Sequence, residues 1–190
     1  MRRCAVIGGL TLSLVQATPS PASAEWLLTP YIGGALFDIP DSSVRPTVGG
    51  SVLWSGPIAG VELDVNVTPD FLEGAKGVAL DKSGLFSLMG NAVVQFPTRS
   101  NRVRPYLVAG GGLLQTSATT ADGVIDSSRS QFGFNAGGGL TAFLTSRVGL
   151  RADLRYFRAA QSAEAAAESK RLGLEPIQHV RATIGFAFRF

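Results

Sequence analysis

His179 is the one histidine of the 190-residue chain, and its side chain is the best suited to acid–base chemistry near neutral pH. As the base of a hydrolase it would need a hydroxyl nucleophile within hydrogen-bond reach. Arg181 occupies the position two residues later, and Ser162 and Ser169 lie in a long connection before it. We therefore favour a histidine packed among interior charges over a catalytic one.

Charged residues alternate with other residues in three stretches. Glu62 and Asp64 are separated by one leucine, and Arg151–Arg155 repeats the spacing with Arg, Asp and Arg. In an extended strand, residues two apart point to the same face of the sheet. We expect these side chains to form a charge network in the lumen of a closed sheet. The expected members are Glu62, Asp64, Arg151, Asp153, Arg155, Arg181 and Arg189.

Two glycine triplets, Gly110–Gly112 and Gly137–Gly139, have the composition of a phosphate-binding loop. Neither is followed by the Gly-Lys-Ser/Thr ending of such a loop, or by helical periodicity and an acidic residue. Glycines inside barrel strands more often allow curvature or leave room for a bulky neighbour. We therefore expect no cofactor at either triplet.

The first 24 residues have the organisation of a secretory signal peptide. Two arginines precede an apolar run, and Ala22-Ser23-Ala24 supplies small residues before the expected cleavage site. The mature domain would then be residues 25–190. Cys4, the one cysteine, would leave with the signal peptide, which excludes a disulfide or a thiolate metal site.

The net charge gives no support to nucleic-acid binding. Removing Arg2 and Arg3 from the 17 basic residues leaves 15 against 14 acidic ones, a net of +1. The sequence also has no basic block with interleaved aromatic residues.

Eight stretches follow a period of two, which predicts β-strands. The last one is the clearest, because its even-numbered residues from Val180 to Phe190 are all apolar. The fifth is ambiguous, because Ala109–Gly112 gives no contrast and a one-residue slip would exchange its faces. The expected strands are about 26–36, 47–55, 59–67, 85–96, 103–115, 132–144, 148–156 and 179–190.

The connections between these strands alternate in length. The short ones are 55–57, 97–101 and 145–147, and the long ones are 37–46, 69–82, 117–130 and 159–178. Short turns on one rim and long loops on the other are typical of barrels in the outer membrane, where a closed sheet pairs all backbone polar groups. We predict an all-β fold, an eight-stranded, antiparallel, up-and-down transmembrane β-barrel. A soluble exported barrel is the alternative.

The last strand carries a recognisable pattern: a polar residue, a glycine and two aromatics. Its residues are Thr183, Gly185, Phe188 and Phe190. The pattern is similar to the C-terminal assembly signal of outer-membrane barrels, and Asn135–Leu140 followed by Leu150–Tyr156 is also similar to such barrels. Residues 25–190 therefore resemble the small eight-stranded outer-membrane β-barrel family, which includes the OmpA transmembrane domain, OmpX and the opacity and porin-family proteins.

The resemblance implies a location in the outer membrane of a Gram-negative bacterium, with both termini in the periplasm. It implies contact with outer-membrane lipid and lipopolysaccharide, and recognition by the barrel-assembly machinery during biogenesis. Barrels that deacylate lipid A carry His-x-Ser along one strand near the outer rim. This chain has His179-Val180-Arg181 at the corresponding place.

These observations favour a non-enzymatic barrel that contributes to envelope integrity and displays its surface loops for contact or adhesion. We expect paired charges to plug the lumen, because eight strands leave an interior about wide enough for side chains alone. Two alternatives stay open: a low-conductance porin-like channel, and a lipid A-modifying hydrolase that uses His179. No motif identifies the surface partner.

Overall fold

The computed structural model describes residues 24–37, 44–69, 80–96, 98, 102–120, 126–160 and 178–190. The expected signal peptide therefore lies outside the described residues, except for Ala24. The part of the chain that is described contains no helix long and apolar enough to cross a membrane.

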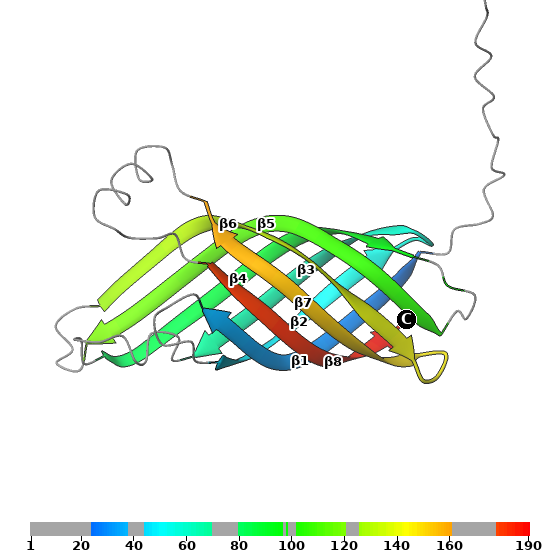
Figure 1. Cartoon of the computed structure of the whole chain (residues 1–190), viewed down its shortest axis with the longest axis horizontal. Helices are drawn as coiled ribbons and strands as arrows, with labels where there is room; N and C mark the ends of the chain where they lie inside the picture. The colour runs from blue at the N-terminus through cyan, green and yellow to red at the C-terminus, as the bar shows by residue number, and fades with distance from the viewer. Residues whose placement is uncertain are drawn as a thin grey trace, which may run out of the picture.

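Eight antiparallel strands form one closed barrel, in which each strand pairs with the next and β1 pairs with β8 (Figure 1). The predicted eight-stranded, antiparallel, up-and-down barrel is confirmed. The strands are β1 (Glu25–Phe37), β2 (Val44–Ser55), β3 (Ala59–Pro69), β4 (Leu80–Gln95), β5 (Val103–Thr120), β6 (Asp126–Phe143), β7 (Val148–Ala159) and β8 (Gln178–Arg189).

One expected connection, residues 117–130, is largely strand. Ser117 pairs with Ser128 and Thr119 with Asp126, so β5 and β6 extend as a hairpin. Figure 1 shows this hairpin reaching beyond the other strands at the end opposite the C-terminus. The expectation of a long loop over 117–130 was wrong, because this segment is rich in serine and threonine, and threonine is also favoured in strands.

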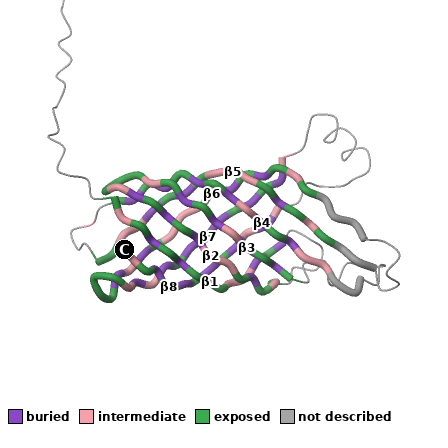
Figure 2. The backbone as a smooth tube through the Cα atoms, turned by 180° about the vertical axis from the view of Figure 1, so that it is seen from behind, coloured by how far each residue is buried: buried purple, intermediate pink, exposed green. Residues whose placement is uncertain are grey.

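Buried and exposed residues alternate along the strands, which shows which residues face the lumen and which face outward (Figure 2). In β5, the ambiguous strand, Tyr106, Val108 and Leu114 are buried, whereas Leu107 and Leu113 are exposed. The even-numbered residues of β5 therefore face the lumen, and the triplet Gly110–Gly112 keeps the register without a slip.

Large apolar side chains cover the outer face of the barrel. Leu63, Leu154 and Ile184 are all more than half exposed at the middle of their strands. Near the strand ends the outer face carries aromatic rings, including a cross-strand pair of Trp26 and Trp54 with ring centroids 6.5 Å apart. A belt of this kind is what lipid-facing strands require, and we call it the apolar belt.

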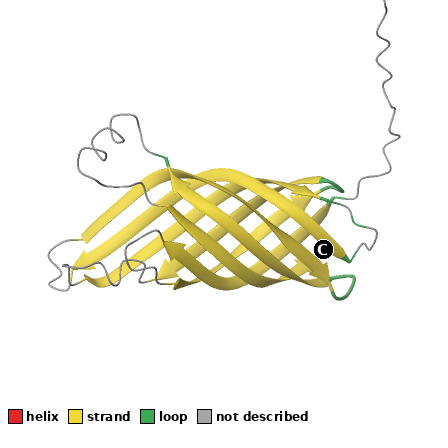
Figure 3. Ribbon diagram, in the orientation of Figure 1, coloured by secondary structure: helices red, strands yellow, loops and turns green. Residues whose placement is uncertain are grey.

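The apolar belt ends at two different rims. The terminal rim carries Glu25, Phe190 and the connections β2–β3, β4–β5 and β6–β7. The loop rim carries the other four connections, including the two longest, those between β3 and β4 and between β7 and β8. Figure 3 shows the barrel as strands throughout, with the described turns gathered at the terminal rim.

Candidate functional site

Six buried charged side chains meet at mid-height in the lumen, and we call them the central charge layer. Glu62 and Asp64 point inward from β3 because they share its inward parity. β7 lies four strands away in the closed order, so it forms the opposite wall. The members of the layer are Glu62, Asp64, Arg151, Asp153, Arg155 and Arg181.

Glu62 joins the two walls of the barrel. Its Oε2 lies 2.6 Å from Nη2 of Arg151, and its Oε1 lies 2.8 Å from Nη2 of Arg155. Three carboxylates and three guanidinium groups make up the layer, so its formal charges balance. Since a buried charge is costly unless it is paired, this balance is a condition for a stable lumen.

The other carboxylates are held by paired hydrogen bonds. Arg181 donates to both oxygens of Asp64 at 3.0 and 3.1 Å, and Arg155 donates to both oxygens of Asp153 at 2.6 and 2.9 Å. Such two-pronged contacts fix orientation as well as charge. Through Asp64, Arg181 ties β8 to β3 across the two intervening strands, β1 and β2.

Two tyrosines, not identified from the sequence, complete the layer in the same way on opposite sides. Tyr31 donates to Asp64 at 2.8 Å, and the guanidinium of Arg181 lies 5.1 Å from the centre of its ring. Tyr106 donates to Asp153 at 2.5 Å, and Arg151 donates to the Tyr106 hydroxyl at 2.7 Å. Each tyrosine therefore reaches an aspartate two strands further along the sheet.

A glycine lies beneath each of these rings. Gly49 on β2 is the register partner of Tyr31, and Gly139 on β6 is the register partner of Tyr106. A Cβ atom at Gly139 would lie 2.3 Å from the Tyr106 hydroxyl oxygen, and one at Gly49 would lie 2.7 Å from that of Tyr31. These glycines are needed because the ring crosses directly over the intervening strand.

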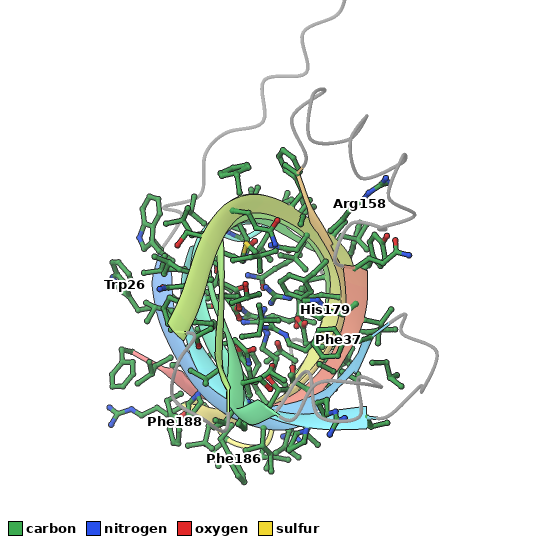
Figure 4. All side chains as sticks on the ribbon, turned by 90° about the vertical axis from the view of Figure 1, so that its left-hand side faces the viewer. Trp26, Phe37, Arg158, His179, Phe186 and Phe188 are labelled. Atoms are coloured by element: carbon green, nitrogen blue, oxygen red, sulfur yellow. The ribbon has the colours of Figure 1, made fainter. Side chains whose placement is uncertain are left out.

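Apolar side chains close the lumen on both sides of the central charge layer. The loop-side cluster consists of Ala35, Phe37, Leu85, Met89, Leu114, Phe157 and Ala159. The terminal-side cluster consists of Leu27, Leu53, Val93, Tyr106, Val108, Phe143 and Ala187. The space left among the arginines, Tyr31 and Thr29 is about 10 Å³, room for about one water molecule. Figure 4 looks along the barrel and shows side chains filling it.

Arg189 does not reach the central charge layer. Its Nη1 lies 3.4 Å from Glu25 at the terminal rim, and its guanidinium also donates to the carbonyl oxygen of Ser146. Arg104 pairs with the same glutamate, and both guanidinium groups lie over the ring of Phe143. Arg189 therefore belongs to a separate cluster that joins β1, β5 and β8 at the rim.

His179 is buried on the lumen side, where aromatic rings contact it and Arg181 lies over one of those rings, that of Phe157. Its ring stacks on Phe157 with centroids 4.7 Å apart and lies 4.8 Å from Phe37 (Figure 4). Its Nδ1 atom is buried without a hydrogen-bond partner. Ser162 and Ser169 lie outside the described residues. Among the residues that are described, no three His, Cys, Asp or Glu side chains are grouped to hold a metal ion.

The residues of the expected assembly signal divide between the faces of β8. Thr183 and Gly185 face the lumen, and a Cβ atom at Gly185 would lie 2.7 Å from Cβ of Tyr31. Phe188 and Phe190 are exposed on the outer side of the barrel. The pattern thus combines space for an interior tyrosine with aromatic contacts on the outside.

Gly139→Ala should destabilise the barrel by about 1–3 kcal/mol, because the new methyl group would lie 2.3 Å from both the Tyr106 hydroxyl oxygen and the backbone carbonyl oxygen of Ala152. Gly90→Ala is the matched control, since its Cβ would face outward with the nearest atom 3.9 Å away. The measurement is the free energy of unfolding by urea in lipid vesicles. Equal stability of the two variants would show that the close approach at Gly139 is unimportant.

Comparison with known proteins agrees with this geometry. Residues 9–190 match the model of the outer membrane protein β-barrel domain. The chain is similar in structure to Neisserial surface protein A, with a TM-score of 0.68 and 17% identity, covering 87% of this chain and 97% of that one. No curated protein is similar enough in sequence to count as a relative.

Two further barrels show the same likeness. The N-terminal barrel of Pseudomonas aeruginosa OprF has a TM-score of 0.57 and 17% identity, with 87% of this chain and 97% of that one covered. Ail, the attachment invasion locus protein of Yersinia pestis, has a TM-score of 0.56 and 14% identity, with 88% and 99% covered. Identities this low establish the fold alone, whereas the domain match spans nearly the whole sequence. The chain therefore belongs to the family of outer membrane β-barrel domains.

Proposed function

We propose that this barrel is a closed structural element of the outer membrane that contributes to envelope integrity and presents its long connections at the cell surface for contact or adhesion. The observation that supports the proposal is the lining of the lumen, in which two apolar clusters lie on either side of the central charge layer. Because the interior is filled, the surfaces left for function are the apolar belt and the two rims. Ail, the attachment invasion locus protein, is named for attachment and has a similar fold.

The proposed orientation places both termini in the periplasm. The terminal rim has short connections, for example the residues between β2 and β3, whereas the extended β5–β6 hairpin rises from the loop rim. Long connections on the outward side are the general pattern of such barrels. In this orientation the apolar belt contacts lipid and lipopolysaccharide, and β8 offers its assembly pattern to the barrel-assembly machinery.

A channel is less well supported than a closed barrel. An ion would have to pass the loop-side cluster, the central charge layer and the terminal-side cluster in turn. Both apolar clusters would dehydrate the ion, and the paired charges between them offer no continuous aqueous path. The hydrolase alternative has no support from the surroundings of His179, whose ring neighbours are Phe37 and Phe157.

In planar lipid bilayers we expect no discrete conductance steps from the wild-type protein. Arg151→Ala should also stay closed, because the two apolar clusters remain in series with the altered layer. Leu154→Ala, on the outer face, is the matched control. Steps in the wild type that Arg151→Ala enlarges would show that ions cross the charge layer and would favour the channel.

Deleting the protein should make cells more sensitive to detergents and to large antibiotics that an intact envelope excludes. The wild type should restore resistance and contact with surfaces. A barrel whose two longest connections, residues 70–79 and 160–177, are replaced by short turns should restore resistance alone. Unchanged sensitivity and unchanged surface contact in the deletion strain would refute the proposal.

A further inference from the structure

A small cavity lies within the central charge layer of the lumen. Its volume is about 10 Å³, and it is lined by arginines from β7 and β8 and by hydroxyl groups from β1, β2 and β8. The hydroxyl residues include Thr29, Ser51 and Thr183, and Thr29 is the register partner of Ser51. Figure 4, which looks along the barrel, shows nitrogen and oxygen atoms in the middle of the lumen. Polar groups from four strands therefore meet around this space.

Several polar atoms of this lining have no hydrogen-bond partner among the residues that the structure describes. One is Nη2 of Arg151, but Oε2 of Glu62 lies only 2.6 Å from it. Three others have no such close contact: Oγ1 of Thr29, Nη1 of Arg155 and Nε of Arg181. These three side chains are at most 2% exposed, and all of them line the cavity. Because a buried polar group without a partner is costly, they indicate a small ligand that completes their hydrogen bonds.

The charge of the surroundings decides which kind of ligand fits. The three guanidinium groups of the layer are balanced by the carboxylates of Glu62, Asp64 and Asp153. An anion would bring an uncompensated negative charge into the lumen, and a cation would add to the three guanidinium groups. Both are costly away from bulk water. The ligand must therefore be neutral, and it must accept hydrogen bonds from two N–H donors.

We propose that the cavity binds one water molecule, which accepts hydrogen bonds from Arg155 and Arg181 and donates one to the hydroxyl of Thr29. The volume admits about one such molecule and nothing larger. Three contacts match the number that a buried water usually makes. The water thus joins β7, β8 and β1, three neighbouring strands of the closed sheet, beside the junction at which the first and last strands pair.

The water adds a link that the direct contacts of the layer do not make. Arg155 and Arg181 both reach carboxylates of β3. Through the water, both arginines are also held from β1 by the hydroxyl of Thr29. Thr29 is therefore a positioning residue for the two arginines, and this role needs a hydroxyl group and not an apolar side chain of the same size.

The test is a crystal structure of the folded barrel at a resolution that shows ordered water. We expect one density peak within about 3.2 Å of Oγ1 of Thr29, Nη1 of Arg155 and Nε of Arg181. A second crystal is soaked in sodium bromide, because bromide gives an anomalous X-ray signal and water does not. We expect no anomalous peak at this position.

Variants identify the residue that holds the water. Thr29→Val keeps the size of the side chain and removes its hydroxyl, so the peak should be lost. Thr29→Ser keeps the hydroxyl, so the peak should stay. Thr141→Val is the matched control, since Thr141 is also buried in the lumen but does not line the cavity. Heat-dependent migration on gels checks that each variant is folded.

Four outcomes would overturn the proposal. Wild-type crystals with ordered water elsewhere but no peak in the cavity would show that no water binds there. A bromide peak would assign the site to an anion. A peak of unchanged height in Thr29→Val would show that Thr29 does not hold the water. A loss in Thr141→Val as well would show a general change of the lumen and not a site. None of these results depends on the proposed orientation or on envelope function.

Discussion

The buried carboxylate of Glu62 is paired with two arginines from the opposite wall of the barrel. The arrangement of the other side chains in the lumen depends on this ion pairing. A carboxylate buried in a lumen without bulk water must be paired, and Arg151 and Arg155 supply the pairing from β7. These arginines in turn donate hydrogen bonds to Asp153 and to the hydroxyl of Tyr106. The requirement to pair each charge thus fixes side chains from several strands in one arrangement.

Period-two alternation was sufficient to predict the strands, the closure and most inward charges, because lipid on one side and charges on the other give strong contrast. The alternation failed as a guide where inward and outward residues do not differ in polarity. Met89 and Val93 are apolar yet face the lumen, so the two apolar clusters were not foreseen. Arg189 has the inward parity, but it lies too near the rim to reach the central charge layer.

The tyrosine–glycine pairs could not be identified from single strands, because they depend on register between neighbours. Tyr31 and Gly49 are far apart in the printed sequence and become opposite residues only when β1 and β2 pair. One signal could have identified these pairs. It is a tyrosine at an inward-facing position of one strand, next to a strand that has a glycine at an inward-facing position. The aromatic contacts of His179 could not be predicted for the same reason, since these neighbours come from β1 and β7.

Because the interior is closed, the surfaces available for function are the outer face of the barrel and its two rims. The apolar belt accounts for contact with lipid, and the terminal rim carries Glu25 with its two arginines, Arg104 and Arg189. The loop rim offers the extended hairpin of β5 and β6 on the opposite side. The two rims therefore have different chemistry, and the filled lumen holds them at a fixed distance.

The central claim is that paired charges hold the two walls of the lumen together, and a double-mutant cycle on Glu62→Gln and Arg151→Met tests it most directly. Unfolding free energies are measured by urea titration in lipid vesicles. Each single variant should lose about 3–5 kcal/mol, because it leaves a buried partner uncompensated. The double variant should lose less than the sum, by about 1.5 kcal/mol or more. Additive losses, within about 0.5 kcal/mol, would contradict the account.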